Sequence, residues 1–485
     1  MLPDIDYRAI SPELILSGTV LLVLTIDLFL KQRRKHWSMW VSFVGVATAL
    51  GFALSNIGTE TRAFGETYVV DSFAVLFKVF FLVVALVVLL LSLRYFRDGR
   101  FYQGEYYFLL LTSFLGMLTI VSSRDLLMLF ISLEVVSAPG FLIAGFRKRD
   151  PRSNEAALKF FLIGILSAAV MLYGMSLLYG VTGTLTLDGI AAKLAAAPEG
   201  LGLAAVLFVV AGFAFKVSAV PFHFWAPDTY EGSPIPVAAF LSVASKAAGF
   251  AGLLQLMFVG FRPLADVWAP VFAILSVLTM SIGNLVAIQQ RQAVRLLAYS
   301  SVAQAGYMLL PFALVRAASD EAATAINEQA FAASVLYILI YAVMNLGAFA
   351  VVTALSRESP GVLIEDFAGL GQRSGAIAVA MGAFMISLAG IPPTAGFWGK
   401  FFIFQAAINA EQAWLAIVMV VNSVVSLYYY AAIVKQMFLV PVAEPRPFRA
   451  PVLVSGVVAL ALAGVVAVGI FPDLLATFPP NATLP

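Results

Sequence analysis

Three lysines stand inside long apolar stretches of the sequence, where a charged side chain is unusual. Lys216 lies in AGFAFKVSAVPFHFWAPDTYEGSPIP, Lys246 in LSVASKAAGFAG and Lys400 in SLAGIPPTAGFWGKFF. An ammonium group in lipid is costly, and it persists mainly where it faces a protein interior or a water-filled path. Lysines in such places can bind and release protons, so these three predict a proton-transfer path. For Lys216, the alternative is a side chain that extends to the membrane surface.

Prolines interrupt the apolar stretches beside two of these lysines. Pro221 closely follows Lys216, and the pair Pro392-Pro393 precedes Lys400. Proline lacks a backbone donor and clashes with the preceding turn, so each helix must be interrupted there. Discontinuous helices near the middle of the membrane are typical of transporters.

Other charged residues also fall within apolar stretches. Glu134, in MLFISLEVVSAPGF, is predicted to stand in mid-membrane, where a carboxylate without a partner takes up a proton. Its predicted partner is Lys216, and packing against a neighbouring helix is the alternative. Lys78 lies near the start of its stretch, so a side chain that extends to the surface explains it adequately. Small residues surround Lys246, as expected where helices pack closely.

The composition of the 485-residue chain is that of a polytopic membrane protein. Hydrophobic residues make up 61% of it and charged residues 12%, with a mean hydropathy of +0.96. Soluble domains have roughly 45–50% apolar residues. The net charge of +2 indicates no nucleic-acid partner. There is no cysteine and there are two histidines, so disulfides and iron–sulfur clusters are excluded and a haem is not expected. We therefore expect no metal site and no redox centre in this chain.

Hydropathy predicts fourteen membrane spans, since each span needs about 20 apolar residues. They cover residues 11–30, 37–57, 70–93, 106–122, 125–146, 156–181, 201–222, 236–260, 267–289, 296–315, 330–355, 376–407, 413–438 and 451–471. The first run is too long for the apolar core of a cleavable signal peptide.

The basic residues test this number of spans independently. When the N-terminus is placed outside, most of the chain's 29 Lys and Arg residues fall in the odd-numbered links, on the cytoplasmic side. This distribution follows the positive-inside rule, which a missed or extra span would disturb. The pattern therefore predicts that both termini lie on the external side.

The two proline breaks indicate an internal repeat. Spans four to eight and nine to thirteen form two units of five, and the fourth member of each unit carries a break and a lysine. Because five crossings is an odd number, the second unit is inverted relative to the first. The expected organisation is three N-terminal helices over 1–105, a first five-helix repeat over 106–260, a second over 261–440 and a C-terminal helix over 441–485.

Three separated motifs resemble one protein family. FKVSAVPFHFWAPDTYEGSP, LLAYSSVAQAGYML and GIPPTAGFWGKFF are similar to the antiporter-like membrane subunits of bacterial NADH–quinone oxidoreductase, respiratory complex I, and most similar to its N-type subunits. M-type subunits typically have glutamate in place of Lys400, and L-type subunits add a long lateral C-terminal helix. Gln304 departs from the pattern, because relatives often have histidine there.

The resemblance implies an all-α polytopic membrane protein of about fourteen helices, with two inverted five-helix repeats broken at spans seven and twelve. It also implies proton translocation driven by quinone reduction elsewhere in the complex. In that role Glu134 and Lys216 are a coupling pair, Lys246 is the central relay and Lys400 is the relay of the second unit. The expected groups that order water, or else only pack helices, are His223, Tyr299, Ser300, Ser301 and Gln304.

The resemblance implies partners and cofactors as well. The partners are the M-, K-, J- and L-type membrane subunits of the complex, in the bilayer of a bacterial plasma (inner) membrane. NADH, FMN, iron–sulfur clusters and quinone are implied for the complex and none of them for this chain. The alternative function is a subunit of a multisubunit cation/proton antiporter. A scaffold that has lost pumping is the third possibility, and the intact set of buried charges disfavours it.

The residue content predicts a subunit without chromophores. The purified chain should show no haem or flavin absorbance and should bind no iron, because it lacks cysteine and its histidines lie in different regions. Absorption spectroscopy and metal analysis of the purified subunit test this, and a stoichiometric cofactor spectrum would contradict it.

Overall fold

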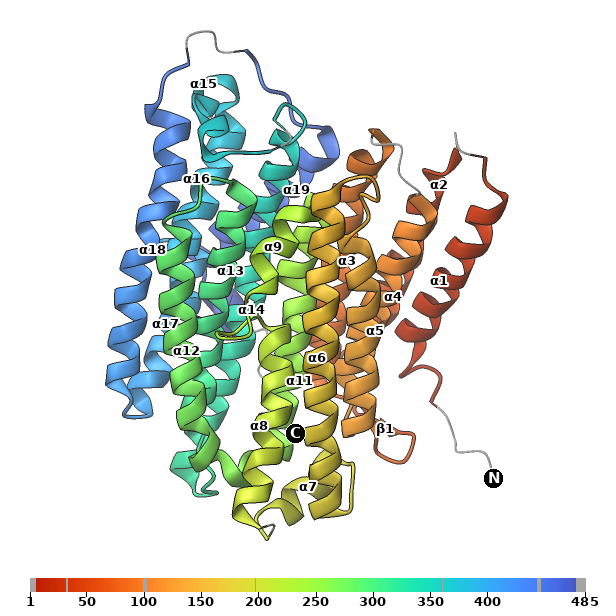
Figure 1. The fold of residues 1–485 in the computed structure, drawn as a ribbon, viewed down its shortest axis with the longest axis vertical. Helices are drawn as coiled ribbons and strands as arrows, with labels where there is room; N and C mark the ends of the chain where they lie inside the picture. Colours follow the sequence, from red (N-terminus) through yellow and green to blue (C-terminus); the bar gives the residue numbers. More distant parts are fainter. Residues whose placement is uncertain are drawn as a thin grey trace.

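The computed structural model describes residues 6–31, 34–98, 103–196, 198–359, 361–442 and 446–476. Arg33 and Arg100, two of the basic residues used to orient the chain, lie outside these ranges. Within them, twelve helices are long and apolar enough to cross a membrane, and two shorter apolar helices belong to interrupted crossings. The fold is therefore an all-α bundle of fourteen crossings, as the sequence predicts (Figure 1).

Three helices and a small hairpin form the N-terminal part. The elements are α1 (Ser11–Phe29), α2 (Trp37–Ser55), β1 (Thr61–Ala63), β2 (Tyr68–Val70) and α3 (Ser72–Asp98). The two strands pair antiparallel between the second and third crossings. Hydropathy did not predict this hairpin, because its strands are only three residues long.

The next five crossings run from α4 to α11. They comprise α4 (Gln103–Ser122), α5 (Leu126–Ala144), α6 (Pro151–Thr182), α7 (Leu187–Leu194), α8 (Glu199–Lys216), α9 (Trp225–Gly232), α10 (Ile235–Phe240) and α11 (Lys246–Gln255). The short link Ser123–Asp125 separates α4 from α5, and the Asp125 side chain caps α5 by accepting from the amide of Leu127 at 2.8 Å. The additional short helix α7 lies between the sixth and seventh crossings.

The remaining crossings follow in the same way. They comprise α12 (Ala265–Ala287), α13 (Ala293–Leu309), α14 (Glu321–Leu355), α15 (Leu370–Arg373), α16 (Gly375–Ala389), α17 (Ala395–Asn409), α18 (Ala413–Leu439), α19 (Val452–Ile470) and α20 (Asp473–Ala476). Helix α19 packs against both α3 and α14, so it ties the N-terminal helices to the second half of the bundle.

Two crossings are interrupted at the predicted prolines. In the seventh crossing α8 ends at Lys216 and α9 begins at Trp225. The predicted span, 201–222, is too short, because the chain resumes a helix beyond the break and continues to Gly232. Pro227 lies in the first turn of α9, where its missing donor costs no internal hydrogen bond. In the twelfth crossing, α16 and α17 flank the Pro392-Pro393 pair.

The eighth crossing is continuous but not uniformly α-helical. A π-helical turn, Leu241–Ser245, separates α10 from α11, and a second, Leu256–Gly260, follows α11. Such turns are often found at functional sites because they re-aim the side chains next to them. The first of them ends immediately before Lys246.

Helices α12 and α13 approach each other unusually closely. A Cβ at Gly306 would lie 2.5 Å from the backbone nitrogen of Met280, and one at Gly283 would lie 2.6 Å from that of Ala303. Each helix therefore offers a glycine to the backbone of the other. This contact fixes α13 along the stretch that includes Ala303 and Gly306.

Replacing Gly306 by valine should separate α12 from α13. Overpacking a core costs about 1–3 kcal/mol, and contact with a backbone leaves little room for relief. We expect less assembled protein and a lower melting temperature of the purified assembly. Gly51→Val is the control, because a Cβ at Gly51 meets nothing within 4 Å. Equal stability of the two variants would contradict the close packing.

Candidate functional site

Lys216 is buried at the end of α8, immediately before the first break. Its ammonium Nζ donates a hydrogen bond to Ser137 Oγ of α5 at 2.9 Å. The residue is 2% exposed, so the alternative of a side chain that extends to the surface is wrong. Its place in the last turn of α8 puts the positive charge beside the carbonyl end of a helix, which the helix dipole favours.

Glu134 lies on the same helix as the hydroxyl that Lys216 contacts. Glu134 and Ser137 are three residues apart on α5, so they share one face of that helix. No ion pair or hydrogen bond joins Glu134 to any other residue that the structure describes. The predicted coupling pair is therefore not in direct contact, and the Lys216 ammonium binds the hydroxyl of Ser137 instead.

A glycine makes room for the Lys216 side chain. A Cβ at Gly249 of α11 would lie 2.9 Å from Lys216 Cγ. Gly249 stands one turn after Lys246 on the same helix. The aliphatic part of the Lys216 side chain therefore packs against α11 one turn from Lys246. The sequence placed both lysines in neighbouring crossings but did not predict this contact.

Lys246 is directed toward α13. Its Nζ donates to the backbone oxygen of Ser301 at 2.7 Å and to Ser301 Oγ at 2.6 Å. Lys246 is 2% exposed and Ser301 is fully buried. The ammonium is thus held by one hydroxyl and one carbonyl, and no carboxylate of the described residues lies within 4 Å of it.

Gln304 is the centre of the polar contacts in the second half. Its Nε2 donates to the backbone oxygen of Leu388 at 3.1 Å and to Tyr430 Oη at 3.2 Å. Tyr337 Oη donates to Gln304 Oε1. The Tyr430 hydroxyl also shares a hydrogen bond of 2.6 Å with Ser300 Oγ. The position where relatives often have histidine is therefore occupied by an amide that both donates and accepts.

Lys400 meets this network at the second break. Its Nζ donates to the backbone oxygens of Leu388, at 3.2 Å, and Ala389, at 2.9 Å. These carbonyls end α16 and have no helical partner, because the chain turns away at Gly390 with a φ of +88°. The ammonium also lies 4.5 Å from the centroid of the Tyr307 ring. Gln304 and Lys400 thus share the Leu388 carbonyl.

Two predicted residues lie apart from these contacts. His223 is buried within the first break, and its Nδ1 has no hydrogen-bond partner in the described part of the chain. Tyr299 is only partly buried and lies under the guanidinium of Arg295, 5.9 Å from ring centroid to Cζ. The ring of Tyr299 therefore faces a charged surface residue.

Sequence patterns did not reveal several residues that complete the site. Ser137 lies three positions from Glu134, a spacing that could have indicated it. Tyr430 comes from α18, and no local signal connects it to Gln304. Thr279 of α12 accepts a hydrogen bond from the amide of Val220 at 2.9 Å, and so gives a partner to a backbone donor within the first break. Among the described residues, no group of three His, Cys, Asp or Glu side chains could hold a metal ion.

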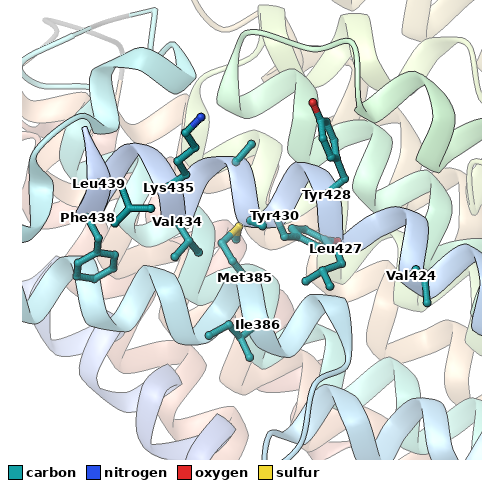
Figure 2. A pocket seen from close by; sticks show the side chains of 12 residues that line it. Met385, Ile386, Val424, Leu427, Tyr428, Tyr430, Val434, Lys435, Phe438 and Leu439 are labelled. Atoms are coloured by element: carbon teal, nitrogen blue, oxygen red, sulfur yellow. The ribbon is translucent and has the colours of Figure 1, made fainter. Parts of the chain in front are cut away.

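Grooves on one flank of the bundle reach the same network. A groove of about 940 Å³ between α16 and α18 is lined by Tyr430, Met385 and Lys435. Figure 2 shows Lys435 and Tyr428 pointing to the same side of α18, away from Ile386. A second groove of about 390 Å³ is lined by Lys400 and Gly390 and adjoins the first along Val424. The residues around Lys400 are therefore reached from the flank of the protein.

Comparison with protein families gives one match over most of the chain. Residues 123–426 match the family described as NADH:quinone oxidoreductase/Mrp antiporter, TM. A protein of Trichlorobacter lovleyi, NADH-quinone oxidoreductase subunit N, is 39% identical over 99% of this chain and 97% of its own length. NADH-quinone oxidoreductase subunit N 2 of Streptomyces griseus is 42% identical over 96% of this chain and 92% of its own length.

Solved structures show the same fold. A chain of respiratory complex I from Thermus thermophilus with bound aureothin superposes with a TM-score of 0.81 and 34% identity, covering 96% of this chain and 98% of that one. A chain of the Mrp complex from Dietzia sp. gives a TM-score of 0.85 at 20% identity, covering 98% and 96%, which shows a shared fold alone.

Proposed function

We propose, from the premise that the chain belongs to the NADH:quinone oxidoreductase and Mrp antiporter family of membrane subunits, that it is a proton-translocating N-type subunit of an NADH–quinone oxidoreductase. Quinone reduction occurs elsewhere in the complex, and NADH, FMN and iron–sulfur clusters belong to other subunits. Its partners are the neighbouring M-, K-, J- and L-type membrane subunits. The membrane is the bacterial plasma membrane, with both termini on the external side.

One observation carries this proposal: a single helix contacts the surroundings of two buried lysines. Ser301, which binds Lys246, and Gln304, which shares a carbonyl with Lys400, are three residues apart on α13. They therefore lie on one face of that helix, about one turn apart. Hydroxyl, amide and carbonyl groups that span this interval can hold water in a proton path.

Several buried polar atoms beside this helix have no partner among the described residues. They are Tyr230 Oη, Tyr341 Oη and Asn345 Oδ1. Buried polar groups of this kind are where proteins bind internal water, and each such water typically makes about three hydrogen bonds. We propose that they complete the path between Lys246 and the second unit.

The separation of Glu134 from Lys216 suits a switch. A carboxylate near an ammonium favours its charged form, and burial favours its neutral form. A small displacement of α5 relative to α8 would therefore change the proton affinity of Lys216. In the arrangement seen here the ammonium donates to Ser137, which lies three residues after Glu134 on α5. We propose that coupling alternates between this hydroxyl and the carboxylate.

The internal symmetry supports alternating access. The proposed units are residues 106–260 and 261–440, preceded by three helices over 1–105 and followed by a helix over 441–485. In both broken crossings, a lysine lies at the carbonyl end of the helix before the break. Lys216 belongs to α8 itself, whereas Lys400 comes from α17 and reaches back to α16. Inverted repeats with broken helices are a frequent basis of transport.

A cation/proton antiporter subunit is the second candidate, because the matched family includes Mrp antiporters. The chain shares the Mrp fold at 20% identity, which does not decide the transported ion. The two functions differ in whether transport requires sodium: a cation/proton antiporter would need it, and a proton-translocating subunit would not.

Replacing Lys216 by alanine should leave an assembled complex that pumps far fewer protons. Lys216 is the lysine that binds Ser137, three residues after Glu134 on the same face of α5. Lys216→Arg should be partly active, since arginine holds its charge but does not readily release a proton. Acidification of vesicles, normalised to assembled complex, gives the measurement. Pumping at the wild-type rate by Lys216→Ala would remove this residue from the path.

Replacing Lys246 by methionine should also abolish most pumping while preserving assembly. Methionine keeps much of the apolar stem and removes the titrating group. We expect transport of H⁺, because a fixed ammonium repels Na⁺ and hard cations need several oxygen ligands. The experiment compares both proteins in sodium-free buffer. Transport that requires added Na⁺, or normal pumping by the variant without it, would favour the antiporter function.

A further inference from the structure

A buried ion pair lies in the N-terminal helices, outside the family match. Lys78 Nζ of α3 is 2.8 Å from Glu13 Oε1 of α1. The Lys78 side chain is 1% exposed, so the interpretation that it extends to the surface is wrong. The family match covers residues 123–426, and the proposed relay uses neither residue. The sequence did not single out Glu13, although Glu13 and Lys78 lie near the first residues of α1 and α3.

The carboxylate of this pair has few partners for a buried group. Both Glu13 oxygens are buried, and the donors close to them among the described residues are the Lys78 ammonium and the Tyr68 hydroxyl. Buried carboxylates normally accept several hydrogen bonds. Lys78 Nζ also donates to Tyr68 Oη at 2.8 Å and lies 4.9 Å from the centre of that ring. Lys78, with the Tyr68 hydroxyl beside it, therefore stabilises the ionised Glu13.

The pair is placed near one end of the bundle. Glu13 lies in the first turn of α1, Lys78 lies in the second turn of α3, and Tyr68 belongs to the hairpin strand β2. Figure 1 shows the hairpin at the same end of the molecule as the start of α1. Burial, and then the nearby Glu13 carboxylate, raise the pKa of Tyr68, so its phenol keeps its proton.

A second ion pair lies at this end, close to the first. Arg124, in the link before α5, forms an ion pair with Asp71 at 2.5 Å and donates to Gln255 of α11. The Asp71 side chain is 18% exposed, and Asp71 stands immediately before α3, seven residues ahead of Lys78. Water at the surface therefore comes within two helical turns of the buried pair.

We propose that Glu13 and Lys78 form a further proton-transfer site at the end of the bundle where α1 begins. This inference rests on the proposed function. The Lys78 ammonium gives one proton to the Glu13 carboxylate, which leaves a neutral amine and a neutral acid. The acid loses that proton to water at this end while the amine takes up a proton from the interior, so neither group is left charged without the other. One proton crosses in each cycle and the ion pair is restored.

The low dielectric constant of the surroundings makes this step accessible. The ion pair and the neutral pair have the same net charge of zero, so the transfer does not bury an uncompensated charge. The alternative is a purely electrostatic contact that fastens α1 to α3. Such a contact requires opposite charges or a neutral replacement, whereas proton transfer requires a titrating amine and a titrating carboxyl.

The double variant Glu13→Gln with Lys78→Met distinguishes the two. Both replacements are neutral and similar in size, so no buried charge is left unpaired and the complex should assemble. We expect its pumping to fall about a hundredfold or more, the scale on which a lost proton-transfer group acts. The control is Asp27→Asn with Lys35→Met, which removes another 2.8 Å ion pair of α1 whose side chains are 13% and 15% exposed. It should pump as the wild type does.

Wild-type pumping by the assembled double variant overturns the inference. If Lys246→Met is inactive in the same assay, the proposed function stands and only the Glu13–Lys78 site fails. If the double variant does not assemble, Lys78→Arg decides, because arginine preserves the contact but does not readily release a proton. Reduced pumping by assembled Lys78→Arg supports proton transfer, and undiminished pumping supports a fastening contact.

Discussion

Every backbone polar group inside a membrane must find its partner within the protein, and this constraint shapes both interrupted crossings. In the first break, the Trp225 indole donates to the oxygen of Phe215 at 2.9 Å, and Thr279 accepts from the amide of Val220. In the second, the Lys400 ammonium binds the two carbonyls that end α16. Lys400, one of the proposed relay lysines, therefore also stabilises the break beside it.

The three central lysines share a type of environment. Each ammonium is bound by neutral oxygen atoms: the hydroxyl of Ser137, the carbonyl and hydroxyl of Ser301, or the carbonyls of α16. Within the described chain, none of the three forms an ion pair. Dipoles stabilise a charge less strongly than a carboxylate in contact does, so a proton is released more readily. The Glu13–Lys78 pair differs from all three, because there the proton acceptor is already in place.

The features that the sequence predicted are those set by a residue and its immediate neighbours in the chain. Hydropathy located the crossings, and Pro221 and Pro392 located the breaks, because a missing donor acts within a single turn. Contacts between distant segments had no such signal. Tyr430 stands 126 residues from Gln304, and the hydrogen bond between them exists only once α13 and α18 pack together. The end of the seventh crossing was missed for a related reason, since α9 has a low apolar content and is held by its neighbours. Glu13 was overlooked because an acid near the end of a span resembles an ordinary surface residue.

The close contact between α12 and α13 has a mechanical consequence. Gly283 packs against the backbone of Ala303, and Gly306 packs against the backbone of Met280. On α13 these two close contacts lie on either side of Gln304. Ser301 and Gln304 are consequently mounted on one stiff segment, and a rotation or shift of that segment alters the partners of Lys246 and Lys400 together. The hydrogen bonds of the two lysines would therefore change in concert, and the packing of α13 on α12 would determine how far the segment can move.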